Sequence, residues 1–114
     1  VHCHRNGGVG YISQFIAVHP AHDLEVFGLM EQRRYEEAQA KIDEVSRVLG
    51  PWVASAGARS GGYRQGKALL AASGRPMGPP RPPTLPCDET EIAEAKTLLQ
   101  ELGWVREAQT VAAG

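Results

Sequence analysis

The sequence predicts a mostly α-helical chain with one β-strand followed by about four helices. A glycine-rich stretch leads into residues 10–16, a run of mainly apolar side chains that is rich in β-branched and aromatic residues. Through most of the remaining sequence, apolar residues recur at steps of three or four, as on one face of a helix. Six of the eight prolines fall between residues 76 and 86, and this segment can form neither a helix nor a central strand.

The predicted strand, Gly10 to Ile16, has no partner in the sequence. Pro20 follows it closely and begins a helical pattern, so the two elements form half of a β/α unit. A single strand leaves backbone N–H and C=O groups unpaired, which is costly when the strand is buried, and no second convincing strand follows. We therefore expect the chain to be the tail of a larger α/β protein.

Two helices are predicted after the strand. The first runs over residues 20–33, with Leu24, Phe27 and Met30 on its apolar face, and ends at a basic pair that suits a helix C-terminus. The second runs over residues 35–49, where Gly50-Pro51 supplies a stop signal, and a further turn over residues 52–56 is compatible with a kink at the proline.

Two more helices are predicted in the second half of the chain. One covers residues 63–73 and ends at Gly74. The extended, proline-rich connector over residues 75–86 separates it from the last helix, which begins near Asp88 and ends at Gly103. Asp88 with Glu91 three residues later matches a capping box. Residues from Trp104 onward contain few large apolar side chains and are expected to fray.

Composition excludes some classes of partner. The chain has 114 residues, 42% hydrophobic residues and a net charge of −1, with an isoelectric point near 6.5. It therefore has no general attraction for nucleic acid or an anionic membrane. Its longest apolar stretch is too short to span a bilayer, which needs about 20 residues. We expect no secretory leader, and the two cysteines do not make a disulfide framework, so a cytoplasmic protein is predicted. We also predict no cofactor.

Several polar groups resemble chemical sites but have simpler explanations. His2-Cys3-His4, with His19 and His22, offers metal-ligand types, but not the two separated pairs of a structural zinc site. We therefore predict no metal site, and we expect residues 1–6 to be an exposed terminus without a fixed structure.

The lysines and the acidic residues also have structural explanations. Lys67 lies beside leucines and could be an amine nucleophile, although a lysine there normally lays its stem over apolar surface. Lys41 and Lys96 are predicted to be solvated. The acidic residues at the start of the last helix are explained by the helix dipole; they are Asp88, Glu89, Glu91 and Glu94.

The proline-rich residues 79–83 could act as a polyproline ligand, but a stiff connector bound to its own domain is the favoured interpretation. No catalytic triad, phosphate-binding loop or dinucleotide-binding motif is present in the sequence. We therefore predict no catalytic residue from the sequence chemistry alone.

Several motifs together resemble the C-terminal part of the dihydrodipicolinate synthase and N-acetylneuraminate lyase family. They are Gly7-Gly8-Val9-Gly10-Tyr11-Ile12-Ser13, Val18-His19-Pro20, Tyr35-Glu36-Glu37-Ala38, Gly66-Lys67-Ala68-Leu69, Arg81-Pro82-Pro83 and Leu102-Gly103. These motifs follow the family's order at about its intervals, from Gly7 to Trp104. They correspond to roughly the last third of a family member.

This resemblance implies a (β/α)8 barrel, also called a TIM barrel, with appended helices, of which this chain is the C-terminal fragment. Family members form a Schiff base between a lysine and pyruvate or another 2-keto acid, and are commonly homotetramers. Residues 7–34 would be the last β/α unit and residues 35–104 the appended helical region. Residues 1–6 match nothing in the family, and residues 105–114 form a tail.

Ile12 is the only site residue that the resemblance carries over. It matches the isoleucine of the eighth strand that contacts bound pyruvate, so we predict that it binds substrate. The family's Schiff-base lysine, proton-relay tyrosine and carboxylate-holding hydroxyl pair belong to earlier strands, and Lys67 matches a lysine of the appended helices. The fragment is therefore expected to be a lyase part that is inactive alone and belongs to a homo-oligomer.

Two departures bear on substrate class. Ala17 stands where the family has an asparagine-like residue, and Phe15 is bulkier than the residue usual near it. The alternative interpretation is a non-catalytic helical module for interaction or oligomerisation, in which residues 10–16 pair with the edge of a partner's sheet.

Overall fold

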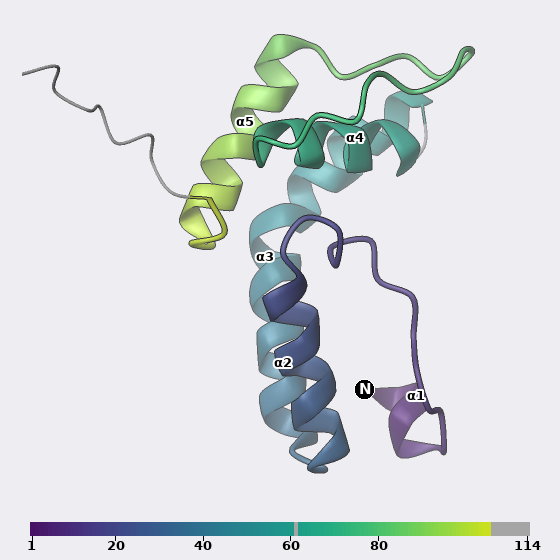
Figure 1. Cartoon of the computed structure of the whole chain (residues 1–114), viewed down its shortest axis with the longest axis vertical. Coiled ribbons are helices and arrows are strands. Elements are labelled where there is room, and N and C mark those ends of the chain that lie inside the picture. The colour runs from purple at the N-terminus through teal and green to yellow at the C-terminus, as the bar shows by residue number, and fades with distance from the viewer. Residues whose placement is uncertain (61, 106–114) are drawn as a thin grey trace, which may run out of the picture.

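The computed structural model describes residues 1–60 and 62–105, and this part of the chain is mostly helical (Figure 1). The helices are α1 (His2–Arg5), α2 (Pro20–Glu31), α3 (Tyr35–Ser60), α4 (Gly62–Ala72) and α5 (Glu89–Glu101). The four predicted helices correspond to α2 through α5. The short α1 was not predicted.

The predicted strand is wrong for the described residues, which contain no β-strand. Residues 8–13 are irregular, and the segment closes in a turn where the N–H groups of Val18 and His19 both donate to the carbonyl of Phe15, each at 2.9 Å. The physical reason is that a strand obtains its backbone hydrogen bonds from a neighbouring strand, whereas a helix makes them within itself.

Helices α2 and α3 pack together along the first part of α3 (Figure 1). Their buried apolar residues form a small core made of Val26, Leu29, Met30 and Ala38. The turn between the helices contains Arg33 at φ 59°, and the N–H of Arg34 donates back to the carbonyl of Leu29 at 2.8 Å. The chain thus ends α2 in a left-handed conformation that is usually given to glycine.

Helix α3 does not stop at Leu49 as the Gly50-Pro51 signal predicts, but continues through the further turn over residues 52–56 and on to Ser60. A proline inside a helix removes one backbone hydrogen bond and disfavours continuation. Here Val48 and Leu49 before Pro51 and Trp52 after it are all buried, so tertiary packing outweighs the local stop signal. As a result α3 contacts α2, α4 and α5.

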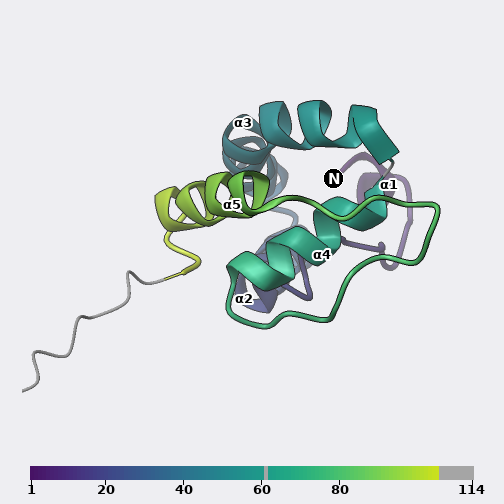
Figure 2. The ribbon, with the colours of Figure 1, turned by 90° about the horizontal axis from the view of Figure 1, so that it is seen from above.

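The second core lies where α3, α4 and α5 meet (Figure 2). Its fully or nearly fully buried side chains include Leu49, Trp52, Leu69, Ala95 and Leu99. The predicted ends of α4 and α5 are confirmed, since Gly74 and Gly103 follow the two helices at φ +83° and +71°. The capping box is confirmed too: Asp88 Oδ1 accepts from the N–H of Glu91 at 2.8 Å, and Glu91 Oε2 accepts from that of Asp88 at 2.9 Å.

The connector between α4 and α5 is bound to its own helices, as the favoured interpretation of residues 75–86 predicts. Arg64, only 3% exposed, donates to the carbonyls of Leu85 and Pro86 at 3.0 Å each. The same guanidinium pairs with both carboxylate oxygens of Glu91 at 2.8 Å. This buried pair joins α4, the connector and the first turn of α5.

Both ends of the described chain are more ordered than the sequence suggests. The N-terminus is mostly exposed, as predicted, but it is ordered: residues 2–5 form α1, and His4 contacts Glu31 Oε1 at 2.7 Å and the Tyr35 hydroxyl at 3.2 Å. Trp104 and Val105 pack against the α3–α4–α5 core, so the expected fraying does not begin at Trp104. Residues 106–114 of the predicted tail lie outside the described residues.

Candidate functional site

The candidate site is the irregular segment from Val9 to Ile16. Val9 is open to solvent, whereas Tyr11 and Phe15 make contacts with the helical part of the chain. The Tyr11 hydroxyl donates toward Asp23 of α2, lying 3.1 Å from Oδ1 and 3.2 Å from the backbone carbonyl. Phe15 packs against the α3–α4–α5 core, with its ring 6.1 Å from that of Trp104. Ser13, between them, is partly buried.

The even-numbered side chains of the same segment turn outward. Ile12 is 100% exposed, Ile16 is 48% exposed, and Gln14 is exposed as well. Over residues 11–15 the exposed Ile12 and Gln14 alternate with side chains that contact the helices, as in an extended strand with one covered face, while Tyr11 itself is 47% exposed. The sequence-predicted site residue, Ile12, is therefore open to solvent, and it lines a groove whose other wall is Tyr63 and Lys67 of α4.

The backbone of residues 9–14 makes no hydrogen bond within the described part of the chain. The nearest backbone donors with partners are Gly8, bonded to the carbonyl of Cys3, and Phe15, bonded to Ser13 Oγ. Six consecutive residues thus expose unpaired donors and acceptors beside apolar side chains. This combination is typical of a strand whose neighbour is missing.

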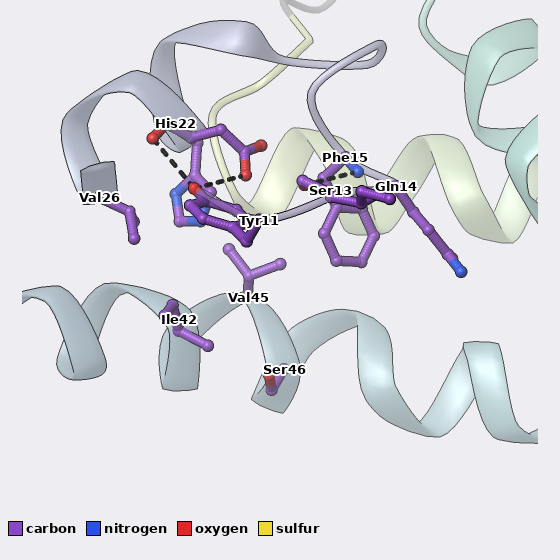
Figure 3. Close-up of a pocket in the computed structure, with 11 residues that line it drawn as sticks. Tyr11, Ser13, Gln14, Phe15, His22, Val26, Ile42, Val45 and Ser46 are labelled. Atoms are coloured by element: carbon purple, nitrogen blue, oxygen red, sulfur yellow. Dashed lines mark hydrogen bonds between the residues drawn. The ribbon is translucent and has the colours of Figure 1, made fainter. Parts of the chain in front are cut away.

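A cavity of about 290 Å³ lies between this segment, the start of α2 and the middle of α3 (Figure 3). Figure 3 shows Tyr11 above Ile42 and Val45 of α3, with His22 and Val26 of α2 on the other side. The wall is mainly apolar, and its polar groups include the Tyr11 hydroxyl, His22 and Asp23.

The Tyr11 hydroxyl is a donor and not a base. Burial, and then the charge and hydrogen bond of Asp23, raise the pKa of Tyr11 to about 12, so the phenol keeps its proton at neutral pH. Asp23 is 7% exposed, and its Oδ2 has no hydrogen-bond partner among the described residues. The pair therefore anchors the segment to α2, and it offers no nucleophile.

The structure does not assemble a reactive centre from the other residues considered in the sequence. Lys67 Nζ donates to the carbonyl of Met77 at 2.8 Å, as a lysine holding the connector would, and Lys41 pairs with Glu25 at 2.9 Å. In the part of the chain described, no three His, Cys, Asp or Glu side chains are grouped so as to hold a metal ion.

The acidic residues at the start of α5 serve the cap, and Glu91 also serves the buried pair with Arg64. That pair was missed because Arg64 and Glu91 are 27 residues apart and Glu91 was already explained by the cap. The Tyr11–Asp23 contact and the group of aromatic rings around Trp104 were missed as well. Nothing in the local sequence around His19 and His22 indicates a contact with Trp104, which follows more than 80 residues later.

Comparisons with protein-family models, curated proteins and solved structures find no match to this chain. No helix in residues 1–60 or 62–105 is both long and apolar enough to cross a membrane. The geometry of the Val9–Ile16 segment and the sequence motifs are thus the basis for assigning a role.

Proposed function

We propose that this chain is the C-terminal part of a dihydrodipicolinate synthase-like lyase, a Schiff-base aldolase or dehydratase that acts on pyruvate or another 2-keto acid. Residues 10–16 would be the closing strand of a (β/α)8 barrel, and α2 the helix that follows it. Helices α3, α4 and α5 would be the appended region. The chain carries no Schiff-base lysine of this family and is inactive alone.

The observation that carries this proposal is the two-faced segment with an unpaired backbone. In a barrel, each strand turns one face to the surrounding helices and the other to the interior, and it pairs with a strand on either side. The segment has its helix-facing side chains in place, with Tyr11 on Asp23 and Phe15 on the core. The side chain of Ile12 is exposed, and the backbone of residues 9–14 has no partner among the described residues. Neighbouring barrel strands would cover the first and pair with the second.

The shape of the molecule also supports the proposal. The Cα radius of gyration is 15.9 Å, whereas a compact single domain of this length has a radius of about 13 Å. Val9, at 91% exposed, and Ile12 are among the large apolar side chains left open to solvent. A chain that leaves this much apolar surface uncovered fits a piece of a larger assembly.

The decisive experiment reads the DNA upstream of the codon for Val1. We expect the same reading frame to continue through seven further β/α units, with a lysine closing the sixth strand. A start codon preceded by unrelated sequence would contradict the proposal.

A chemical test follows with two proteins, this chain alone and the upstream-extended chain, each treated with pyruvate and borohydride and then weighed. The extended chain should trap a covalent adduct, while this chain should not, although it holds three lysines. Lys67→Arg is the matched control, because it keeps the charge that binds the Met77 carbonyl but cannot form a Schiff base. If Lys67→Arg in the extended chain abolished the adduct, Lys67 would be the nucleophile and the proposal would be overturned.

Ile12 is the proposed contact to substrate. In the extended enzyme, Ile12→Ala should raise KM for pyruvate, whereas Tyr11→Phe, which changes the helix-facing side, should leave KM closer to its original value. The enzyme is expected to be a homo-oligomer located in the cytoplasm, which size-exclusion chromatography and cell fractionation test.

A second candidate is a non-catalytic helical interaction or oligomerisation module. The self-contained core of α3, α4 and α5 favours it, because these helices bury Leu49, Leu69 and Leu99 without any missing neighbour. In this case residues 10–16 would add a strand to a partner's sheet. A compact particle with cooperative thermal unfolding would favour the module, and aggregation of the isolated chain would favour the lyase fragment.

A further inference from the structure

The end of the Val9–Ile16 segment meets the end of α5 in a group of four aromatic rings. Trp104 follows α5, and its indole stacks on His19 with ring centroids 5.0 Å apart and an interplanar angle of 17°. The indole also contacts His22 at 5.3 Å and Phe15 at 6.1 Å. His19 and His22 belong to the N-terminal boundary of α2, so these rings join α2 to α5.

We propose that Phe15, His19, His22 and Trp104 form a pH-responsive joint, in which protonation of His22 releases Trp104 from the start of α2. The positive end of the α2 dipole lies at this helix terminus and disfavours a second positive charge there. The joint is independent of the lyase proposal, because it needs only the residues that the structure describes.

The charged groups around His22 act in both directions. Asp23 and Glu25 on α2 favour the imidazolium, while Lys41 on α3 and His19 disfavour it. Trp104 and Phe15, which come from the other two segments, are neutral. Arg75 of the connector donates to the carbonyl of Val18, next to His19, and is not among the charges that act on His22.

Burial has the largest effect, and it lowers the pKa of His22 from its ordinary value of 6.5. The unfolded chain therefore binds the proton more readily than the folded chain does. The contribution of neutral His22 is fully present above pH 6.5 and is lost as the pH falls through the lowered pKa. Acidification is thus expected to open the joint.

Nuclear magnetic resonance of the full chain tests the proposal. The two tryptophans give two indole N–H signals, which Trp104→Phe assigns. Between pH 8 and pH 5 we expect the Trp104 signal to shift with a midpoint below 6.5, and its Overhauser contacts with Phe15 and His22 to disappear. The Trp52 signal, from the buried core, should stay in place.

Variants separate the joint from general acid unfolding. His22→Gln should abolish the transition of Trp104, whereas His2→Gln, on the exposed α1, should leave it unchanged. If His22→Gln fails to fold, as judged by circular dichroism, His22→Asn repeats the test.

Three results would overturn the proposal. The first is a transition that persists in the folded His22 variant. The second is contacts of Trp104 that survive at pH 5. The third is a midpoint above 6.5, which would mean that attraction between the imidazolium and the indole face outweighs burial.

Discussion

The α3–α4–α5 region and the Val9–Ile16 segment differ in whether their backbone N–H and C=O groups have hydrogen-bond partners within the described chain. In the first, helical hydrogen bonds, a capping box and glycine C-caps serve the backbone groups, and Leu99 is completely buried. In the second, the backbone of residues 9–14 has no partner in the described chain, and Ile12 is completely exposed. A helix can be completed by its own residues, but a strand depends on another segment.

The largest effect is expected at the buried ion pair of the helical region. Glu91→Gln removes the counter-charge of Arg64, whose guanidinium stays buried, and should lower the free energy of unfolding by about 3–5 kcal/mol. Urea denaturation followed by circular dichroism measures the loss. Glu89→Gln, at an exposed position in the same turn, is the control and should change little.

A cavity in the same core is expected to have a similar or slightly smaller effect. Leu99→Ala removes a side chain with no exposed surface and should cost about 2–5 kcal/mol in the same denaturation assay. Leu24→Ala, on an exposed position of α2, should cost far less. Equal losses for the two variants would contradict the core described here.

The turn between α2 and α3 offers a stabilising change. Arg33 has a left-handed backbone conformation that costs less free energy for glycine, whereas glycine also raises the entropy of the unfolded chain. The net effect of Arg33→Gly should be a free energy of unfolding higher by about 0.5–1 kcal/mol. The gain appears as a higher midpoint of thermal unfolding. Gln32→Gly, at an ordinary φ of −80°, should have the opposite sign.

The smallest change in stability is expected at Ile12, and it tests most directly the difference between the exposed Val9–Ile16 segment and the buried helical core. Ile12→Ala in the isolated chain should change the free energy of unfolding by less than about 0.5 kcal/mol, because the side chain of Ile12 is already fully exposed in the folded chain. If the segment closes a barrel in a longer protein, the same change there should cost several times more. A large loss in the isolated chain would mean that Ile12 is already buried in solution.

Local patterns in the sequence predicted the helices well. The spacing of apolar residues gave α2, α4 and α5 to within two residues at each end, and Asp88 with Glu91 gave the cap of α5. Ile12 was singled out by resemblance, and the structure leaves it on an open face. The helices and the cap depend on neighbours within about one turn of helix, which is why the sequence alone contains them.

Contacts between residues distant in the sequence determined the features that local patterns did not predict. The continuation of α3 through Pro51 follows from burial of Leu49 and Trp52, and the joint around Trp104 brings together residues more than 80 positions apart. The β-branched and aromatic character of residues 10–16 favours a strand, yet the segment stays irregular because no other segment supplies hydrogen bonds to it. Local propensity sets what a segment can form, and only the surrounding chain determines whether its polar groups find partners.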